Sequence, residues 1–498
     1  MGDADDFDPR EAPRARTWWL TFAAGPVAGA VLWWLARPGG ANGAGLAEGA
    51  GGDGMFSPEG AIVLGLLAWM AIWWATQAVE LAATALLPVV VLTLVGAVPP
   101  DEVLAPYAND IIFLFGGGCV LGLAIERHGL AQRLLSLVLA VVGRSPGRVV
   151  AALLLVSAMV SAWVSNTATT VMLLPIAMAA LAMYSQGVDR EGPAGASLAN
   201  FEKASVLAVG YGATIGGVIT ILGSPPNPIA VDWLRDNGTA MTFVGWARVG
   251  LPAAILMMIV AQLIFRWMLP TKGLPAPLRQ PQRVHAPLTR GAWITIVVFL
   301  LAASAWILGP LVKELVPALS LSDGMIAVAA GLVLLVVPAH RGSGTPVVPW
   351  SMAARMPWGV FILVGGGLSL ANAMQSTGVS SAVAHAMEGI GSMPALLVVL
   401  GVVAALVFAS ELASNAALTA TAVPIVGAMA PGLGVPPEKL VVASALAASM
   451  AFMLPVGTPP NAIIYATGKL PVRDMMRLGF LLNLASIGIV TLVCWLLA

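Results

Sequence analysis

Long apolar runs, separated by short polar stretches, fill almost the whole chain. About eleven of these runs reach the length that a helix needs to cross a lipid bilayer. The predicted spans are 17–36, 59–78, 80–98, 111–126, 204–234, 247–269, 291–312, 323–339, 357–376, 440–467 and 475–497. The pattern therefore predicts an all-α polytopic membrane protein.

Two further apolar runs, 149–183 and 393–430, are longer than one helix and carry polar residues near their centres. We expect each to form a re-entrant hairpin, which enters and leaves the membrane on one side. With the N-terminus in the cytoplasm, this arrangement satisfies the positive-inside rule, because few of the 24 Lys and Arg residues then fall outside. Those few are Arg37, Arg235, Arg248, Lys313 and Lys439.

The two hairpins carry one motif at their centres. Residues 161–168 and 410–417 both read S-x-x-x-S-N-x-A, and the two copies lie 249 residues apart. Basic residues flank the first hairpin, whereas Glu388 and Glu438 flank the second, so the copies are expected to face opposite sides of the membrane. This predicts an inverted-topology repeat, which is typical of secondary transporters.

A second motif, G-[ST]-P-P-N, occurs once in each repeat, in the spans 204–234 and 440–467. Consecutive prolines remove backbone donors and clash with the preceding turn, so both spans are predicted to be broken helices. The predicted units are an N-terminal segment with the first helix (1–58), a first repeat (59–270), a cytoplasmic connector (271–290) and a second repeat (291–498).

Composition excludes several classes of protein. Charged residues make up 10% of the chain and hydrophobic residues 59%, whereas soluble domains have about 25% charged residues. The basic residues form no stripe that could bind nucleic acid. Cys119 and Cys494 have no second thiol or histidine at ligand spacing, so neither a disulfide framework nor a zinc site is indicated. The four histidines are scattered, which argues against an enzyme, and no organic cofactor is expected.

The four motifs contain no Lys or Arg. Broken helices expose half-helix ends at membrane depth, and each end supplies only about half a charge. A dianion bound there would therefore need cations bound beside it. Sodium suits the neutral Ser, Thr and Asn oxygens on offer, and its gradient could drive accumulation.

Other polar features are ambiguous. Glu411 is the carboxylate next to a motif, and either proton coupling or a position near the outer mouth would explain it. The glycine triplets 116–118 and 365–367 predict close helix packing. A solvated loop end is expected at Asp232, Arg235 and Asp236.

Together, the two doubled motifs and the closing stretch 466–474, ATGKLPVRD, resemble the divalent anion/sodium symporter family. This family includes dicarboxylate, citrate and sulfate transporters, and the resemblance extends from about residue 59 to the C-terminus. It implies a homodimer in the plasma (inner) membrane, in which a transport domain moves against a scaffold by an elevator-type motion. The substrate site would lie between the two hairpin tips.

The resemblance assigns roles by position. The first sodium site would use Ser161, Ser165, Asn166 and Gly223. The second sodium site would use Ser410, Ala413, Asn415 and Gly457. The substrate would contact Asn166, Thr167, Ser224, Asn415, Ala416, Thr458 and Pro459. Ala416 stands where the family usually has a threonine, so it has no hydroxyl to donate to the substrate.

The expected function is import of di- or tricarboxylates of the succinate, malate and fumarate class, coupled to sodium. A sodium-independent dicarboxylate exchanger and a sulfate/sodium symporter remain open as alternatives. A channel fits less well, because broken helices in an inverted repeat suit alternating access.

Overall fold

The computed structural model describes residues 15–37, 56–143, 145–186, 188–192, 194–274, 287–315, 321–342, 344–387 and 393–498. Within these ranges the regular structure is helical, apart from an isolated bridge between Pro338 and Pro346. Most of the predicted connector lies outside the described residues, as do 1–14 and 38–55 of the predicted N-terminal segment and Glu388 beside the second hairpin.

The helices of the first half begin and end as follows. They are α1 (Ala15–Ala36), α2 (Pro58–Thr76), α3 (Leu81–Thr84), α4 (Leu87–Leu94), α5 (Pro100–Leu104), η2 (Ala105–Ala108), α6 (Asp110–Arg127), α7 (Leu130–Val142), α8 (Pro146–Ser161), α9 (Asn166–Tyr184), α10 (Gly195–Gly216), α11 (Pro226–Asp236) and α12 (Phe243–Met268).

The second half continues with a similar series. Its helices are α13 (Arg290–Leu315), α14 (Asp323–Val336), α15 (Trp350–Ala353), α16 (Trp358–Ser376), α17 (Val379–Met387), α18 (Ala395–Ala409), α19 (Asn415–Met429), α20 (Pro437–Ala448), α21 (Pro459–Tyr465) and α22 (Val472–Leu497).

Eight of the described helices are long and apolar enough to span a membrane. They are Trp18–Ala36, Pro58–Thr76, Pro100–Arg127, Asn166–Tyr184, Phe243–Met268, Arg290–Gly309, Trp358–Ser376 and Val472–Leu497. Seven of these helices match predicted spans, and Asn166–Tyr184 is one arm of the first predicted hairpin. Two further predicted spans form shorter apolar helices, Leu81–Leu94 and Asp323–Val336, and the remaining two are interrupted. The predicted all-α membrane fold is confirmed, and the re-entrant course of the hairpins remains a prediction.

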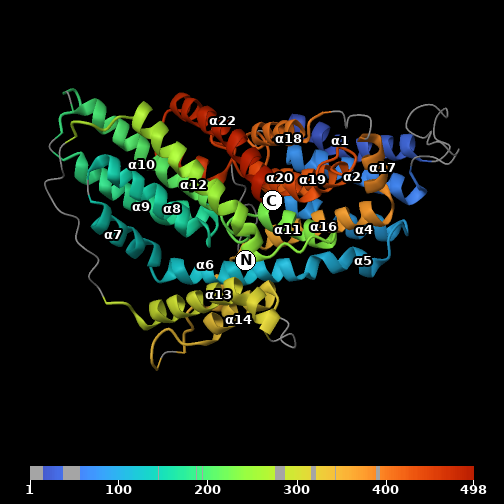
Figure 1. The fold of residues 1–498 in the computed structure, drawn as a ribbon, viewed down its shortest axis with the longest axis horizontal. Helices are drawn as coiled ribbons and strands as arrows, with labels where there is room; N and C mark the ends of the chain where they lie inside the picture. The colour runs from blue at the N-terminus through green and yellow to red at the C-terminus, as the bar shows by residue number, and fades with distance from the viewer. Residues whose placement is uncertain are drawn as a thin grey trace, which may run out of the picture.

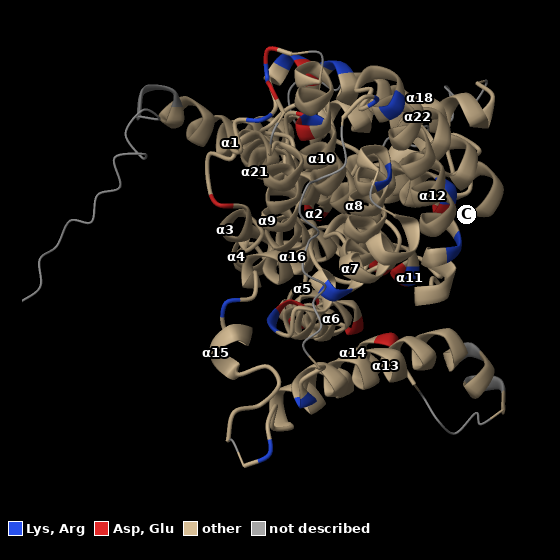
Figure 2. Ribbon diagram, turned by 90° about the vertical axis from the view of Figure 1, so that its left-hand side faces the viewer, with Lys and Arg blue, Asp and Glu red and all other residues tan. Residues whose placement is uncertain are grey.

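Helix α6 lies between the main body of helices and the pair α13 and α14 (Figure 1). In Figure 1, α7 to α10 and α12 lie on the left, and α1, α2, α4, α5 and α17 lie on the right. Helices α13 and α14 pack against one another and against α6. Charged segments are few and lie mostly toward the edges of the molecule (Figure 2), while large apolar side chains such as Leu94 and Trp267 are exposed. Such a surface suits contact with lipid.

Each predicted hairpin is a pair of helices joined by a short turn. Helices α8 and α9 are joined by residues 162–165, and α18 and α19 by residues 410–414. The Thr170 hydroxyl donates to the Asn166 carbonyl at 2.8 Å, and the Thr419 hydroxyl donates to the Asn415 carbonyl at 2.7 Å. The two tips therefore share their local hydrogen bonding as well as their motif.

Both predicted helix breaks are present, although they begin earlier than the proline pairs indicate. Helix α10 ends at Gly216 and α11 begins at Pro226, while α20 ends at Ala448 and α21 begins at Pro459. The prolines thus start the second half-helix in each case and do not end the first. The first turn of a helix accepts proline, because its N–H groups have no partner within the helix.

The glycine triplets pack closely against neighbouring helices, as the sequence predicts. A Cβ atom on Gly117 would overlap Ala327 of α14, and one on Gly366 would overlap the Ala85 carbonyl. These contacts bring helix backbones together in a way that only glycine allows.

Candidate functional site

An asparagine side chain spans each helix break. Asn227 Nδ2 donates to the carbonyls ten and seven residues before it, at 2.8 and 2.7 Å. Asn461 Nδ2 likewise donates to the carbonyls ten and seven residues before it in the chain, at 3.1 and 3.0 Å. Both Oδ1 atoms are buried without a hydrogen-bond partner among the described residues. The sequence contains these residues in its G-[ST]-P-P-N motif, but their bridging role requires the folded loop.

The first hairpin tip docks onto the first break. The Thr220 hydroxyl donates to the Ala162 carbonyl at the tip. The Asn166 amide satisfies its hydrogen bonding when its nitrogen faces the surrounding acceptors. In that orientation the nitrogen lies 3.1 Å from the Ala213 carbonyl and 3.2 Å from the Gly223 carbonyl. The same nitrogen lies 2.7 Å from Ser161 Oγ. The tip and the break therefore form one continuous polar structure.

Carbonyl oxygens crowd together around Gly223. A Cβ atom built there would lie 2.5 Å from the Gly217 oxygen and 2.7 Å from the Ser161 oxygen. The Asn166 amide lies close against Gly217 as well. Several oxygens that converge without an opposing side chain form a suitable environment for a hard cation such as sodium.

The second hairpin tip docks onto the second break through a carboxylate. Glu411 Oε1 accepts from the backbone N–H groups of Phe452 and Met453 at 2.7 and 2.8 Å, and Oε2 accepts from that of Leu454 at 2.9 Å. Asn483 Nδ2 of α22 donates to Oε1 at 2.8 Å. Glu411 is only 3% exposed, so it lies in the interior and not at a solvated mouth.

The other residues of the second tip surround this carboxylate. The Ser410 hydroxyl donates to the Val407 carbonyl at 2.8 Å. Asn415 Oδ1 is buried and has no partner among the described residues. A Cβ atom on Gly457 would lie 3.1 Å from Glu411 Oε2 and 3.4 Å from the Glu411 carbonyl oxygen. Oxygen atoms therefore gather at the second tip as they do at the first.

Both tips and both breaks line one cavity of about 930 Å³. All residues predicted to contact substrate are in its wall: Asn166, Thr167, Ser224, Asn415, Ala416, Thr458 and Pro459. Five of the predicted sodium ligands line the cavity: Ser165, Asn166, Ala413, Asn415 and Gly457. The remaining ones, Ser161, Gly223 and Ser410, are buried behind the lining. Residues far apart in the chain are thus brought to one site.

Residues that were not among the predicted site residues complete the cavity wall. Glu80, Glu126 and Arg355 contribute charge, and Arg355 is the one Lys or Arg in the lining. Trp163 of the first hairpin tip also lines the cavity, and its ring packs edge-on against Phe299 of α13 at 4.7 Å. The sequence motifs gave no signal for the three charged residues, because the fold alone brings them to the site, whereas Trp163 occupies a variable position of the first motif.

Residues 53–497 match the family described as the sodium:sulfate symporter transmembrane region. The chain belongs to this family. The match covers both hairpins and both helix breaks, and it confirms the resemblance to divalent anion/sodium symporters.

Relatives within the symporter family support the same assignment. A protein from Staphylococcus saprophyticus named sodium-dependent dicarboxylate transporter SdcS is 34% identical over 450 residues, which cover 89% of this chain and 86% of the relative. A protein of that name from Staphylococcus aureus strain bovine RF122 / ET3-1 is 34% identical over 446 residues, with 88% and 86% covered.

Two solved transporter structures share the fold. The YdaH transporter of Alcanivorax borkumensis, described as having an unusual topology, aligns with a TM-score of 0.60 at 15% identity and covers 96% of this chain and 97% of its own. MtrF of Neisseria gonorrhoeae, described as one of a class of antimetabolite efflux pumps, aligns with a TM-score of 0.54 at 14% identity, with 97% and 95% covered. At these identities the likeness concerns the fold alone.

In this symporter, the prediction of a solvated loop end near residue 235 is wrong for two of its three residues. Asp232 is 4% exposed within α11. Arg235 forms ion pairs with Asp110 at 3.3 Å and Asp323 at 2.8 Å, at the N-terminal ends of α6 and α14. Only Asp236 is exposed as predicted. The helix packs its end against its neighbours, which local sequence does not reveal.

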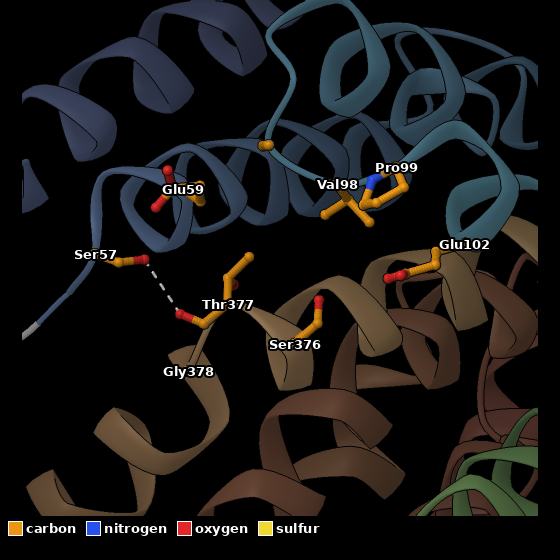
Figure 3. A pocket seen from close by; sticks show the side chains of 9 residues that line it. Ser57, Glu59, Val98, Pro99, Glu102, Ser376, Thr377 and Gly378 are labelled. Atoms are coloured by element: carbon orange, nitrogen blue, oxygen red, sulfur yellow. Dashed lines mark hydrogen bonds between the residues drawn. The ribbon is translucent and has the colours of Figure 1, made fainter.

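A second pocket, of about 590 Å³, lies away from the symporter motifs. Figure 3 shows the side chains of Glu59 and Glu102 in this pocket, together with the contact between Ser57 Oγ and the Thr377 carbonyl at 3.4 Å. It contains none of the predicted site residues. Among the described residues, two carboxylates and no basic side chain line this pocket, so they do not suit an anionic substrate.

Proposed function

We propose that the protein imports di- or tricarboxylate anions of the succinate, malate and fumarate class together with sodium ions. The observation that carries this proposal is the single cavity that both hairpin tips and both helix breaks line. The sodium-dependent dicarboxylate transporters among its relatives match most of this chain and support the same substrate class.

The wall of the cavity suits an anion. Helices α9, α11 and α19 begin at residues that line or adjoin it. Helix N-termini present free N–H groups and a partial positive charge, which favour carboxylates. Asn166, Thr167, Ser224, Asn415 and Thr458 offer further polar groups. These contacts are proposed to hold the two ends of a dicarboxylate between the tips.

Sodium ions are proposed to balance the charge of the substrate. The crowded carbonyls around Gly223 and the unpartnered oxygen of Asn415 are the kind of ligand that sodium accepts. The proposed ligands of the first ion are Ser161, Ser165, Asn166 and Gly223. Those of the second ion are Ser410, Ala413, Asn415 and Gly457. Sodium is a co-transported ion in this scheme.

Access is proposed to alternate by an elevator-type motion. The cavity wall includes Gln77, Glu80, Glu126 and Arg355, at helix ends that the charge pattern assigns to the cytoplasm. With that orientation, the cavity would face inward. The moving domain would contain the hairpins, the broken helices, α12 and α22, which pack on one another. Helices α1 to α6, α13, α14 and α16 would form the scaffold. An inner-membrane homodimer with cytoplasmic N-termini completes the proposal.

Two alternatives keep specific support. Ala416 lies in the cavity wall without a hydroxyl, which favours weaker carboxylate contacts and would suit a sodium-independent exchanger. The family description names sulfate, a smaller dianion.

Uptake of radiolabelled succinate into proteoliposomes separates these functions. We expect uptake with an inward sodium gradient and none when potassium replaces sodium. Uptake without sodium that requires internal dicarboxylate would indicate an exchanger, and competition by sulfate but not by malate would indicate a sulfate carrier. Asn415→Ala should remove transport while the protein keeps its elution profile in detergent. Native mass spectrometry tests the homodimer.

A further inference from the structure

Glu411 is a buried carboxylate with no basic partner. It is 3% exposed, and no ion pair links it to a Lys, Arg or His side chain within the described part of the chain. All of its hydrogen-bond partners are donors: three backbone N–H groups and the Asn483 amide. An ionised carboxylate only accepts hydrogen bonds, so this environment suits its charged form.

These contacts satisfy the carboxylate oxygens but leave their charge without a counter-ion. Removing a charge from water is costly unless it is both hydrogen-bonded and paired with an opposite charge. Among the described residues, no side chain supplies a counter-ion for the Glu411 carboxylate.

The first half of the chain has no carboxylate at the position equivalent to Glu411. Ala162 is the counterpart of Glu411, 249 residues earlier. Helices α12 and α22 pack against the two breaks in the same way. Gly250 of α12 packs against the Val218 carbonyl, and Gly479 of α22 packs against the Phe452 carbonyl. Asn483 lies four residues after Gly479, and the residue four after Gly250 is an alanine.

The two tips are thus attached to their breaks by different chemistry. The first tip uses a neutral bond, from the Thr220 hydroxyl to the Ala162 carbonyl. The second tip uses the Glu411 carboxylate, which reaches the corresponding loop at Leu454. Glu411 and Asn483 have no counterpart in the first half of the chain. Because the first hairpin docks without such a pair, docking of a hairpin does not by itself require them.

Glu411 also lies directly beside the proposed second sodium site. Its Oε2 atom would be 3.1 Å from a Cβ atom on Gly457. Ser410 and Ala413 flank it in the same turn, and the Asn415 oxygen nearby has no partner among the described residues. The uncompensated charge and the unpartnered oxygen therefore both belong to the second hairpin tip.

We propose that Glu411 is a positioning residue that supplies the fixed negative charge for the second sodium ion. Its carboxylate holds the loop at 452–454 in place and attracts the ion bound by Ser410, Asn415 and Gly457. The second site is thereby the tighter of the two. This inference rests on the proposed sodium-coupled function.

The size of the effect follows from electrostatics. Two unit charges about 6 Å apart, at an effective dielectric constant of about 20, change a dissociation constant by roughly a hundredfold. Partial neutralisation by the backbone N–H groups reduces this value. We therefore expect loss of the charge to weaken sodium binding by at least about tenfold.

The test compares four variants in the full-length protein. Glu411→Gln removes the charge and keeps the shape, whereas Glu411→Asp keeps the charge and shortens the reach. Asn483→Ala removes one hydrogen bond and leaves the charge. Thr220→Val is the matched control, because it removes the neutral bond of the first tip. Two quantities are measured: the sodium concentration for half-maximal succinate uptake, and the sodium-dependent rise in thermal unfolding midpoint without substrate.

Charge and geometry predict different orders among the variants. We expect Glu411→Gln to raise the half-maximal sodium concentration at least about tenfold, with most of the maximal uptake recovered at high sodium. The half-maximal sodium concentration of Glu411→Asp should lie closer to that of the unaltered protein than the value for Glu411→Gln does, although the shorter side chain reaches fewer N–H groups. The half-maximal sodium concentrations of Asn483→Ala and Thr220→Val should stay within about threefold of the value for the unaltered protein. The sodium-dependent rise in unfolding midpoint should shrink most in Glu411→Gln.

Three results would overturn the inference. The first is a Glu411→Gln protein whose half-maximal sodium concentration is unchanged. The second is a Glu411→Asp protein that is impaired more than Glu411→Gln, which would indicate a purely geometric role. If Glu411→Gln does not fold, the comparison of Glu411→Asp with Asn483→Ala decides: a larger sodium defect in Glu411→Asp contradicts the charge role. An unaltered protein that needs no sodium would instead refute the proposed function itself.

Discussion

At the scale of single residues, unpartnered oxygens mark the site. Asn227, Asn415 and Asn461 each keep a buried Oδ1 atom without a hydrogen-bond partner among the described residues. A buried polar atom without a partner is costly, and a bound ion or substrate removes that cost. Asn415 lines the cavity, so its unpartnered oxygen supports binding of a cation there.

Ala416 permits a direct test of substrate contact. It lies in the cavity wall and is 8% exposed. Ala416→Thr should bind succinate about tenfold more tightly, because a hydroxyl bonded to a carboxylate contributes roughly 1.5 kcal/mol. Ala416→Val has a similar size without the hydroxyl and is the control. Equal affinities of these two variants in equilibrium binding would show that residue 416 does not contact the substrate.

At the scale of elements, each broken helix depends on its bridging asparagine. The side chain ties together carbonyls that the interrupted helix leaves without partners. The two breaks use the same bond pattern, so each is a defined structure and not a local loss of order.

Removing a bridge should destabilise the protein. Asn227→Ala and Asn461→Ala should each lower the free energy of unfolding by about 1 to 3 kcal/mol, because buried carbonyls lose their donors. Asn237→Ala is the control, since that amide bonds a carbonyl at the exposed end of α11. Thermal unfolding in detergent provides the comparison. Midpoints of the two bridge variants that match the control would contradict this role.

The sequence predicted the elements better than their boundaries. Hairpins and breaks repeat as motifs, so their existence could be predicted. The end of α10 at Gly216 could not, because it depends on the Asn166 amide that lies against Gly217 from another element. Arg235 likewise appeared to be a loop residue, since its partners Asp110 and Asp323 are remote in the chain. The role of Glu411 required the folded loop that it contacts.

At the scale of the whole molecule, one interface separates the proposed moving domain from the scaffold. Arg235 pairs with Asp110 and Asp323 across it. Phe243 stacks on Trp306 of α13 at 4.8 Å and donates its N–H to Asp323. These contacts lie at the opposite end of α6 from Glu126 in the cavity wall. An elevator-type motion would have to separate them in each cycle.

Cross-linking tests whether this interface must open. In a background without the native cysteines Cys119 and Cys494, Arg235→Cys and Asp323→Cys are joined by a reducible bifunctional thiol reagent. We expect cross-linking to stop succinate uptake and reduction to restore it, because the two bodies can no longer slide.

A second pair controls for the reagent. Lys203 and Asp474 form an ion pair at 2.6 Å between α10 and α22, both within the proposed moving domain. Cross-linking of Lys203→Cys to Asp474→Cys should leave uptake intact. Continued uptake with the Arg235 pair cross-linked would exclude a sliding motion at this interface.

Calorimetric titration of the purified protein with succinate, in sodium chloride and in choline chloride, tests directly whether the two ligands share a site. We expect sodium to tighten succinate binding at least about tenfold. Succinate must then tighten sodium binding by the same factor, because coupling between two ligands is reciprocal. Equal succinate affinity in the two salts would contradict the claim that sodium ions and a dicarboxylate share one site between the hairpin tips.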